Sequence, residues 1–244
     1  MDDRRTFGGI LGTALEVYGQ RFWTFFAIAL VGQFLLTLGG TFLSLVSREE
    51  PTLNNAAVMA AGVAAFLVGL IPYAMQVPAM FFALAETHRG RPVTIGQAFD
   101  RASARLTWEA FWANLIAGWL TVGGVLLGVV PGIVFGVWFC LSDVVVVLEG
   151  ERNLGALRRS QRLVKGHGGK ALALLLVSFL MAALTLILNW LLSGHPGAGL
   201  LWWLMGVVVA PFQYALRVLL YFDLRARQEA GAPHDGAASE EAGP

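Results

Sequence analysis

The sequence has little charge for its length. Of its 244 residues only 14% are Asp, Glu, Lys or Arg, whereas 57% are hydrophobic. A soluble domain usually carries about 25% charged residues. The chain therefore lacks the polar residues that a water-facing surface requires. Its net charge of +1 gives no reason to expect nucleic-acid binding.

Residue types that commonly build catalytic or metal sites are also scarce. The single cysteine, Cys140, lies in an apolar run, which excludes a disulfide framework and a cysteine-based zinc site. The four histidines are scattered without ligand spacing, and neither an HExxH pair nor a GxSxG elbow occurs. We expect no metal, no cofactor and no enzymatic activity. A membrane-embedded hydrolase is the weakest alternative, because no nucleophile–base arrangement is apparent.

Long apolar runs dominate the sequence instead. A helix that crosses a bilayer needs roughly 20 consecutive apolar residues, and about six segments qualify. Pro72 and Pro78 lie in the second segment, where we expect a kink rather than a break, because membrane helices tolerate proline. The predicted spans are 22–47, 56–85, 111–130, 132–148, 171–193 and 200–222.

The third and fourth spans come from one apolar block, 111–148, in which Asp143 is the only charged residue. The block is too long for one span, and Pro131-Gly132 near its middle predicts the turn of a helical hairpin. Small residues at four-residue spacing allow close helix packing. The glycines that predict such packing between these two spans are Gly124, Gly128, Gly132 and Gly136.

A short amphipathic segment precedes each odd-numbered span, at 8–20, 94–106 and 153–165. Such segments can lie in the membrane interface. The predicted fold class is an all-α polytopic membrane bundle of about six transmembrane helices, arranged as three parallel hairpin units that each begin with an interfacial helix. One domain covers residues 1–228, and the small, polar tail 229–244 is expected to be disordered.

Basic residues are distributed unevenly between the two predicted sides. One side holds 15 of the 17 Lys and Arg residues, Arg48 lies on the other, and Arg217 lies within the last span. Cytoplasmic loops are enriched in Lys and Arg, so we expect both termini in the cytoplasm. The N-terminus lacks the features of a signal peptide, and the arginine-rich usage is typical of a bacterial protein. These patterns predict a multi-pass protein of the cell (inner) membrane.

Several short motifs between Gly96 and Arg227 resemble one family. They are VPGI at 130–133, Trp138, VVVVLEG at 144–150, ALRRS at 156–160, LVKG at 163–166 and YFDLR at 221–225. Together they resemble the glycerophosphoryl diester phosphodiesterase membrane-domain family, which includes stand-alone membrane domains. The resemblance implies that Glu149 accepts hydrogen bonds from the start of the following interfacial helix. It does not imply phosphodiesterase activity, because the catalytic barrel of roughly 250 residues has no counterpart here.

Two ionisable residues lie inside predicted spans. A charge at mid-membrane costs roughly 2.5–3.5 kcal/mol, so such residues are functional candidates. Asp143 can serve a substrate or a proton, or it can make a packing hydrogen bond or face a hydrated inner cavity. It can also reach interfacial water, since Glu149 is only about 9 Å further along a helix. Arg217 can pair with Asp143 or Glu149, or extend to the headgroups.

Two further groups of residues are candidates. A carboxylate ends each hairpin unit, and Glu86, Glu149 and Asp223 would form a cluster if the units packed in a ring. Basic residues in and after the third amphipathic segment can bind anionic lipid headgroups. These candidate headgroup-binding residues are Arg158, Arg159, Arg162 and Lys165.

Two functions follow from these patterns. The first is a non-catalytic membrane module that interacts with the lipid bilayer or with an unidentified protein partner. The alternative is a transporter or channel for a small or lipid-like solute that uses Asp143, Arg217 and the proline-kinked helices. No predicted span carries a continuous polar stripe, which favours the first function.

Overall fold

The computed structural model describes residues 6–46, 53–192, 195 and 198–231, and all regular structure in these ranges is helical. This confirms the predicted all-α class. Six helical stretches are long and apolar enough to cross a membrane within the described ranges. The helices are α1 (Phe7–Gln20), α2 (Phe22–Val46), α3 (Leu53–His88), α4 (Ile95–Arg101), α5 (Ala104–Leu127), α6 (Val129–Phe139), α7 (Ser142–Glu149), α8 (Leu154–Val164), α9 (Gly168–Leu192) and α10 (Ala198–Gly231).

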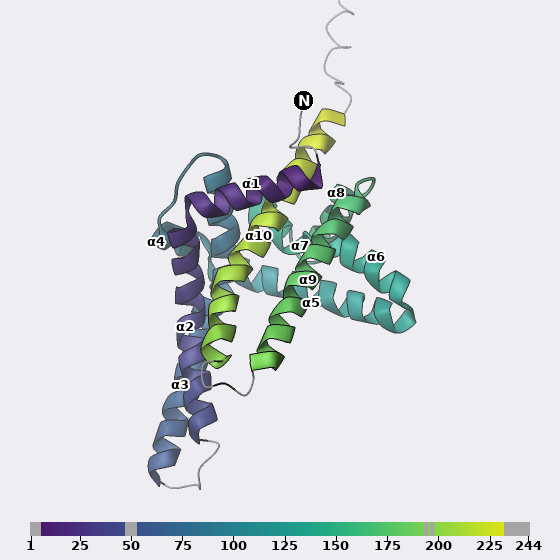
Figure 1. Ribbon diagram of the computed structural model, residues 1–244. Coiled ribbons are helices and arrows are strands. Elements are labelled where there is room, and N and C mark those ends of the chain that lie inside the picture. The colour runs from purple at the N-terminus through teal and green to yellow at the C-terminus, as the bar shows by residue number, and fades with distance from the viewer. Residues whose placement is uncertain (1–5, 47–52, 193–194, 196–197, 232–244) are drawn as a thin grey trace, which may run out of the picture.

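A short helix precedes each of three hairpins, as the sequence predicted. Helix α1 comes before α2–α3, α4 before α5–α6, and α8 before α9–α10. Helix α1 and the end of α10 lie at the same end of the molecule (Figure 1). We call this the basic end, because α8 and its arginines also lie there. Helix α3 continues through Pro72 and Pro78 without a break.

Two predicted boundaries are wrong at the ends of helices. The segment 94–106 is not one helix, because α4 ends at Arg101 and the Ser103 hydroxyl accepts a hydrogen bond from the Leu106 amide, which starts α5. Serine is a favoured helix N-cap. At the other end of the chain, α10 extends to Gly231, so residues 229–231 are helical. The rest of the predicted tail, 232–244, lies outside the described residues.

The turn between α5 and α6 lies at Gly128 rather than at Pro131-Gly132. Gly128 has φ 149°, and its amide donates to the carbonyl oxygens of Gly124 and Val125. Pro131 lies in the first turn of α6, where backbone amides have no acceptor within the helix. The absence of an amide hydrogen in proline therefore costs no hydrogen bond there. The predicted fourth span, 132–148, falls within the candidate span Val129–Glu149, but the chain leaves the helix between α6 and α7.

Close glycine contacts hold two of the hairpins together. In α6, a Cβ added to Gly132 would lie 2.8 Å from the Val125 amide nitrogen of α5. In α2, a Cβ added to Gly39 would lie 2.8 Å from the Gly62 carbonyl oxygen of α3. Real Cβ atoms do not approach backbone this closely, so each crossing requires glycine. The predicted close packing of the third and fourth spans is confirmed.

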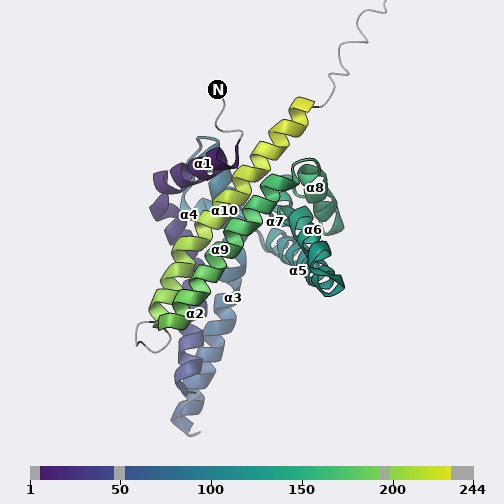
Figure 2. The same cartoon turned by 45° about the vertical axis from the view of Figure 1, so that its right-hand side comes forward.

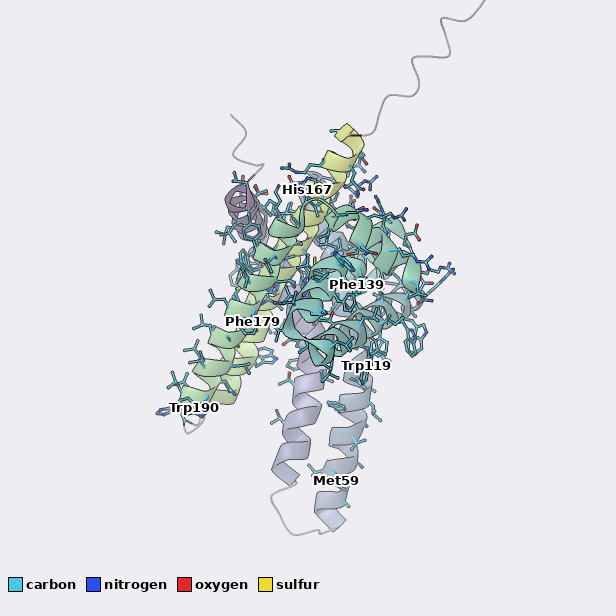
Figure 3. The ribbon with its side chains drawn as sticks, turned by 90° about the vertical axis from the view of Figure 1, so that its right-hand side faces the viewer. Met59, Trp119, Phe139, His167, Phe179 and Trp190 are labelled. Carbon is cyan, nitrogen blue, oxygen red and sulfur yellow. The ribbon has the colours of Figure 1, made fainter. Side chains whose placement is uncertain are left out.

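The three hairpins differ in direction. The α2–α3 and α9–α10 hairpins run steeply away from the basic end, whereas α5–α6 leans outward and its turn lies at the side of the molecule (Figures 1 and 2). Figure 3 shows Trp119 of α5 closer to the basic end than Trp190 of α9 and Met59 of α3. The turn of the leaning hairpin is apolar, with Leu126 84% and Val130 72% exposed.

Buried side chains concentrate toward the basic end. There α7 and α8 pack against the second halves of α3 and α10. The first half of α3 and the second half of α9 instead expose apolar side chains, among them Met59, Leu67, Leu186 and Trp190. In a bilayer these side chains would contact lipid. Fully buried large residues of the core include Phe81, Leu84, Leu141, Leu216, Leu220, Tyr221 and Leu224.

Candidate functional site

Asp143 and Arg217 form an ion pair between α7 and α10. Arg217 Nη1 donates a hydrogen bond to Asp143 Oδ2, and the two atoms are 2.8 Å apart. The other carboxylate oxygen, Oδ1, accepts a hydrogen bond from the Val144 amide at 2.9 Å. Asp143 lies in the first turn of α7, where the helix dipole favours a negative charge. Of the alternatives that the sequence left open for Arg217, the structure shows the pairing with Asp143.

The two members of this pair differ in accessibility. The side chain of Asp143 is 2% exposed, and that of Arg217 is 29% exposed. Asp143 therefore does not reach interfacial water, and that interpretation is wrong. Its carboxylate faces protein, while part of the Arg217 side chain remains open to its surroundings.

Arg217 lines a cavity of about 340 Å³. Helices α5, α6 and α9 supply most of its walls, together with Cys140 just after α6. The walls carry four polar side chains besides the cysteine, although the surrounding helix surfaces are apolar. The lining residues are Asn114, Ala117, Gly118, Thr121, Val122, Gly136, Phe139, Cys140, Leu174, Leu175, Ser178 and Arg217.

Ser160 of α8 makes hydrogen bonds to the backbone between α6 and α7. Its hydroxyl donates to the Trp138 carbonyl oxygen at 2.7 Å and accepts from the Leu141 amide at 3.3 Å. These bonds satisfy backbone groups where the chain passes from α6 to α7, as buried polar groups require. Sequence reasoning missed Ser160, and only its place in the ALRRS motif singled it out.

Glu149 lies at the end of α7 and binds side chains from two other helices. Its carboxylate accepts two hydrogen bonds from Arg159, at 2.7 and 2.9 Å, and one from the Tyr221 hydroxyl at 2.8 Å. Arg159 also donates to Gln228 Oε1 at 2.8 Å. Hydrogen bonding to Glu149 raises the pKa of Arg159 above its ordinary value. The expected bonds from the start of α8 to Glu149 do not occur among the described residues; the partner is a side chain one turn later.

Asp223 of α10 has different partners. Its Oδ2 accepts from Lys170 Nζ at 2.6 Å and from Arg227 Nε at 3.0 Å. Lys170 is in the first turn of α9, so this pair joins the two helices of the last hairpin near the basic end. Asp223 also lines a smaller cavity of about 240 Å³ with His88.

Glu86 of α3 pairs with Arg89 at 2.7 Å. Each of the three hairpin-ending carboxylates thus has its own basic partner. No group of three acidic, histidine or cysteine side chains is close enough to hold a metal ion in the part of the chain that the structure describes. The predicted cluster of Glu86, Glu149 and Asp223 is therefore wrong, because each carboxylate is neutralised within its own neighbourhood.

The four candidate headgroup residues divide into two groups. Arg158, Arg162 and Lys165 are exposed on the outer side of α8, whereas Arg159 turns inward to Glu149. The other face of α8 is buried against the bundle. Arg159 is consequently a structural ion-pair partner, and the prediction that it contacts headgroups is wrong. Sequence reasoning also missed two inward partners, Tyr221 and Lys170. Tyr221 begins the YFDLR motif, whereas Lys170 carries no distinguishing pattern.

Comparisons of the chain with protein-family models, with curated proteins and with solved structures give no match.

Proposed function

We propose that the chain is a non-catalytic integral membrane protein that binds anionic lipids on its basic side. The observation that carries this proposal is the outer side of α8, where Arg158, Arg162 and Lys165 are exposed together. The opposite face of the same helix, which includes Leu157 and Leu163, is buried. Helix α8 is therefore fixed to the bundle with its cations directed outward. An anionic membrane surface attracts each such cation by about 1 kcal/mol.

Orientation in the cell is part of the same proposal. The predicted side that holds 15 of the 17 Lys and Arg residues includes α8 and the end of α10, so the basic end would face the cytoplasm of a bacterial cell, with both termini on that side. The resemblance to the phosphodiesterase membrane-domain family would then concern the membrane portion of that family. Supporting this, Ser142 and Ser160 are both engaged with backbone carbonyl oxygens, and neither is arranged as a nucleophile.

Lipid retention tests the proposal. The purified full chain, in mixed phosphatidylcholine and phosphatidylglycerol, would be extracted in nonionic detergent and weighed by native mass spectrometry. We expect bound phosphatidylglycerol to exceed bound phosphatidylcholine, and the triple variant R158Q/R162Q/K165Q to lose most of this preference. The matched control R91Q/R101Q/R105Q removes three arginines near the same end but outside α8. Equal losses in the two triple variants would contradict a lipid site on α8.

Transport of a solute is the second candidate function, and the cavity beside Arg217 is the observation that favours it. Val122, one of its lining residues, is 54% exposed, so the cavity opens toward the lipid-facing surface of α5. This opening suits lipid binding better than an aqueous path. Flux of small anions from liposomes that contain the protein would distinguish the two functions. Flux that Asp143→Asn abolishes would replace the binding function with transport.

A further inference from the structure

The cavity beside Arg217 contains polar groups without partners. Neither the Asn114 side chain nor the Ser178 hydroxyl makes a hydrogen bond within the described ranges of the chain. The Thr121 hydroxyl donates to the Ala117 carbonyl oxygen at 2.8 Å and keeps its own oxygen lone pairs. Polar groups at membrane depth are costly unless they are satisfied. A ligand that offers hydrogen-bond acceptors and donors here would satisfy them.

The Asp143–Arg217 pair determines which sign of ligand charge this cavity favours. Asp143 is enclosed in protein with 2% of its side chain exposed, and Arg217 presents its exposed part to the cavity. The pair is formally neutral, but its positive member, Arg217, lines the cavity and its negative member, Asp143, does not. In surroundings of low dielectric constant such an oriented pair favours an anion over a cation. A guanidinium also suits the planar or tetrahedral oxygens of carboxylate and phosphate.

The remaining walls are apolar. Leu174 and Leu175 of α9 and Val122 of α5 face the same space. Beside the cavity, Trp119 is 68% exposed on α5 and Phe179 is 73% exposed on α9, and Figure 3 shows these two residues on separate helices. An acyl or alkyl chain attached to an anionic head could therefore lie between the two helices and continue into the bilayer.

We propose that this cavity binds a single amphiphile whose phosphate or carboxylate head contacts Arg217 and whose apolar tail lies between α5 and α9. The volume of about 340 Å³ is at the lower end of ordinary ligand pockets, which fits a head and the first part of a tail. The proposal deepens the proposed lipid-binding function, but it concerns a site inside the membrane rather than the outer side of α8.

Two glycines of α5 provide a matched pair of variants. Gly118 lines the cavity, and a Cβ added to it meets nothing within 4 Å, so Gly118→Leu places a large side chain at the cavity wall with room for its Cβ. A Cβ added to Gly123 also meets nothing within 4 Å, but Gly123 does not line the cavity. Both changes add the same side chain to the same helix and leave the Asp143–Arg217 pair intact.

The experiment measures binding of dodecyl phosphate to the full chain in nonionic detergent, by native mass spectrometry. We expect one dodecyl phosphate per chain, held about tenfold more tightly than dodecyltrimethylammonium. Gly118→Leu should weaken it by about tenfold, and Gly123→Leu should leave it unchanged. R158Q/R162Q/K165Q should also leave it unchanged, so a failure of the α8 site and a failure of this site give different results.

Three results would overturn the proposal. The first is equal affinity of the Gly118→Leu and Gly123→Leu variants for dodecyl phosphate. The second is equal affinity of the unmodified chain for the anionic and cationic amphiphiles. The third is binding of inorganic phosphate as tight as that of dodecyl phosphate, which would mean that the site takes a free anion and no tail.

Discussion

The α2–α3 and α5–α6 hairpins have the same kind of glycine crossing but different directions. Each is tightened where a glycine of one helix touches the backbone of the other, Gly39 in the first and Gly132 in the second. Yet α2–α3 runs steeply from the basic end, and α5–α6 leans outward (Figure 1). Contacts within a hairpin therefore do not determine its direction. What differs is how each hairpin joins the rest of the bundle.

The leaning hairpin returns to the bundle through a broken helix. Helix α6 has 11 residues and is roughly 16 Å long, about half of a hydrocarbon core of roughly 30 Å. Helix α7 then carries Asp143 to Arg217 of α10. Ser160 of α8 fixes the break itself. The consequence of the lean is the space between α5 and α9 into which Arg217 faces.

Loss of Arg217 should lower the stability most, because it removes the ion pair that connects α7, at the end of the leaning hairpin, to α10. Arg217→Gln leaves Asp143, which is 2% exposed, as an unpaired buried charge. Breaking such a pair costs about 3–5 kcal/mol. Thermal unfolding in detergent, followed by tryptophan fluorescence, should show a large fall in Tm. The double variant D143N/R217Q should recover much of the loss, and equal Tm values for the single and double variants would argue against the pair as the joint.

An intermediate effect is expected at the glycine crossings. Gly132→Ala and Gly39→Ala should each destabilise by about 1–3 kcal/mol, because a methyl group would meet backbone. Gly123→Ala, which meets nothing within 4 Å, is the control. Only Gly132→Ala should also weaken dodecyl phosphate binding, since α6 lines the cavity and α2 does not. Equal binding by the two crossing variants would show that the cavity does not depend on the packing of α5–α6.

The smallest effect concerns a contact that does not involve α5–α6. The Tyr18 hydroxyl of α1 donates to the Val208 carbonyl oxygen of α10 at 2.8 Å, and its loss in Tyr18→Phe should cost about 1 kcal/mol. Dodecyl phosphate binding should not change. Tyr73→Phe is the control, since Tyr73 is 46% exposed.

The same tyrosine predicts a dependence on pH. Burial raises the pKa of Tyr18 to about 12, whereas an unfolded tyrosine has a pKa of about 10. Between these values the unfolded chain loses a proton that the folded chain keeps, so stability should be intact below pH 10 and fall as pH rises toward 12. Unfolding measured against pH should show a smaller decline for Tyr18→Phe. An identical decline in both proteins would contradict this role.

Much of the fold could be predicted from the sequence, because helices in a bilayer are determined mainly by long apolar runs. The order of short helices and hairpins follows from such patterns, whereas the sequence left Asp143 as only one of the possible partners of Arg217. The break between α6 and α7 could not be predicted, since it depends on Ser160 from a later helix. Nor could the inward turn of Arg159, because its neighbours Arg158 and Arg162 have the same chemistry and differ only in direction.

The lean of α5–α6 also left only a weak signal in the sequence. Residues 126–130 form a turn without a polar side chain, which is typical of a turn that does not reach water. Apolar periodicity is the same for an upright and a leaning hairpin, so the direction required the structure. Without that direction, Arg217 could not be placed beside a cavity.

The most direct test of this account is the membrane depth of the α5–α6 turn. In a Cys140→Ala background, a nitroxide label at Leu127, which is 83% exposed, would be compared with a label at Leu191 near the far end of α9, which is 60% exposed. Power-saturation EPR in liposomes measures collisions of each label with oxygen and with a water-soluble nickel chelate. We expect the label at Leu127 to meet oxygen and to be shielded from the chelate, and the label at Leu191 to be more accessible to the chelate. Equal chelate accessibility at both positions would mean that α5–α6 crosses the bilayer as α9–α10 does, and would contradict the account.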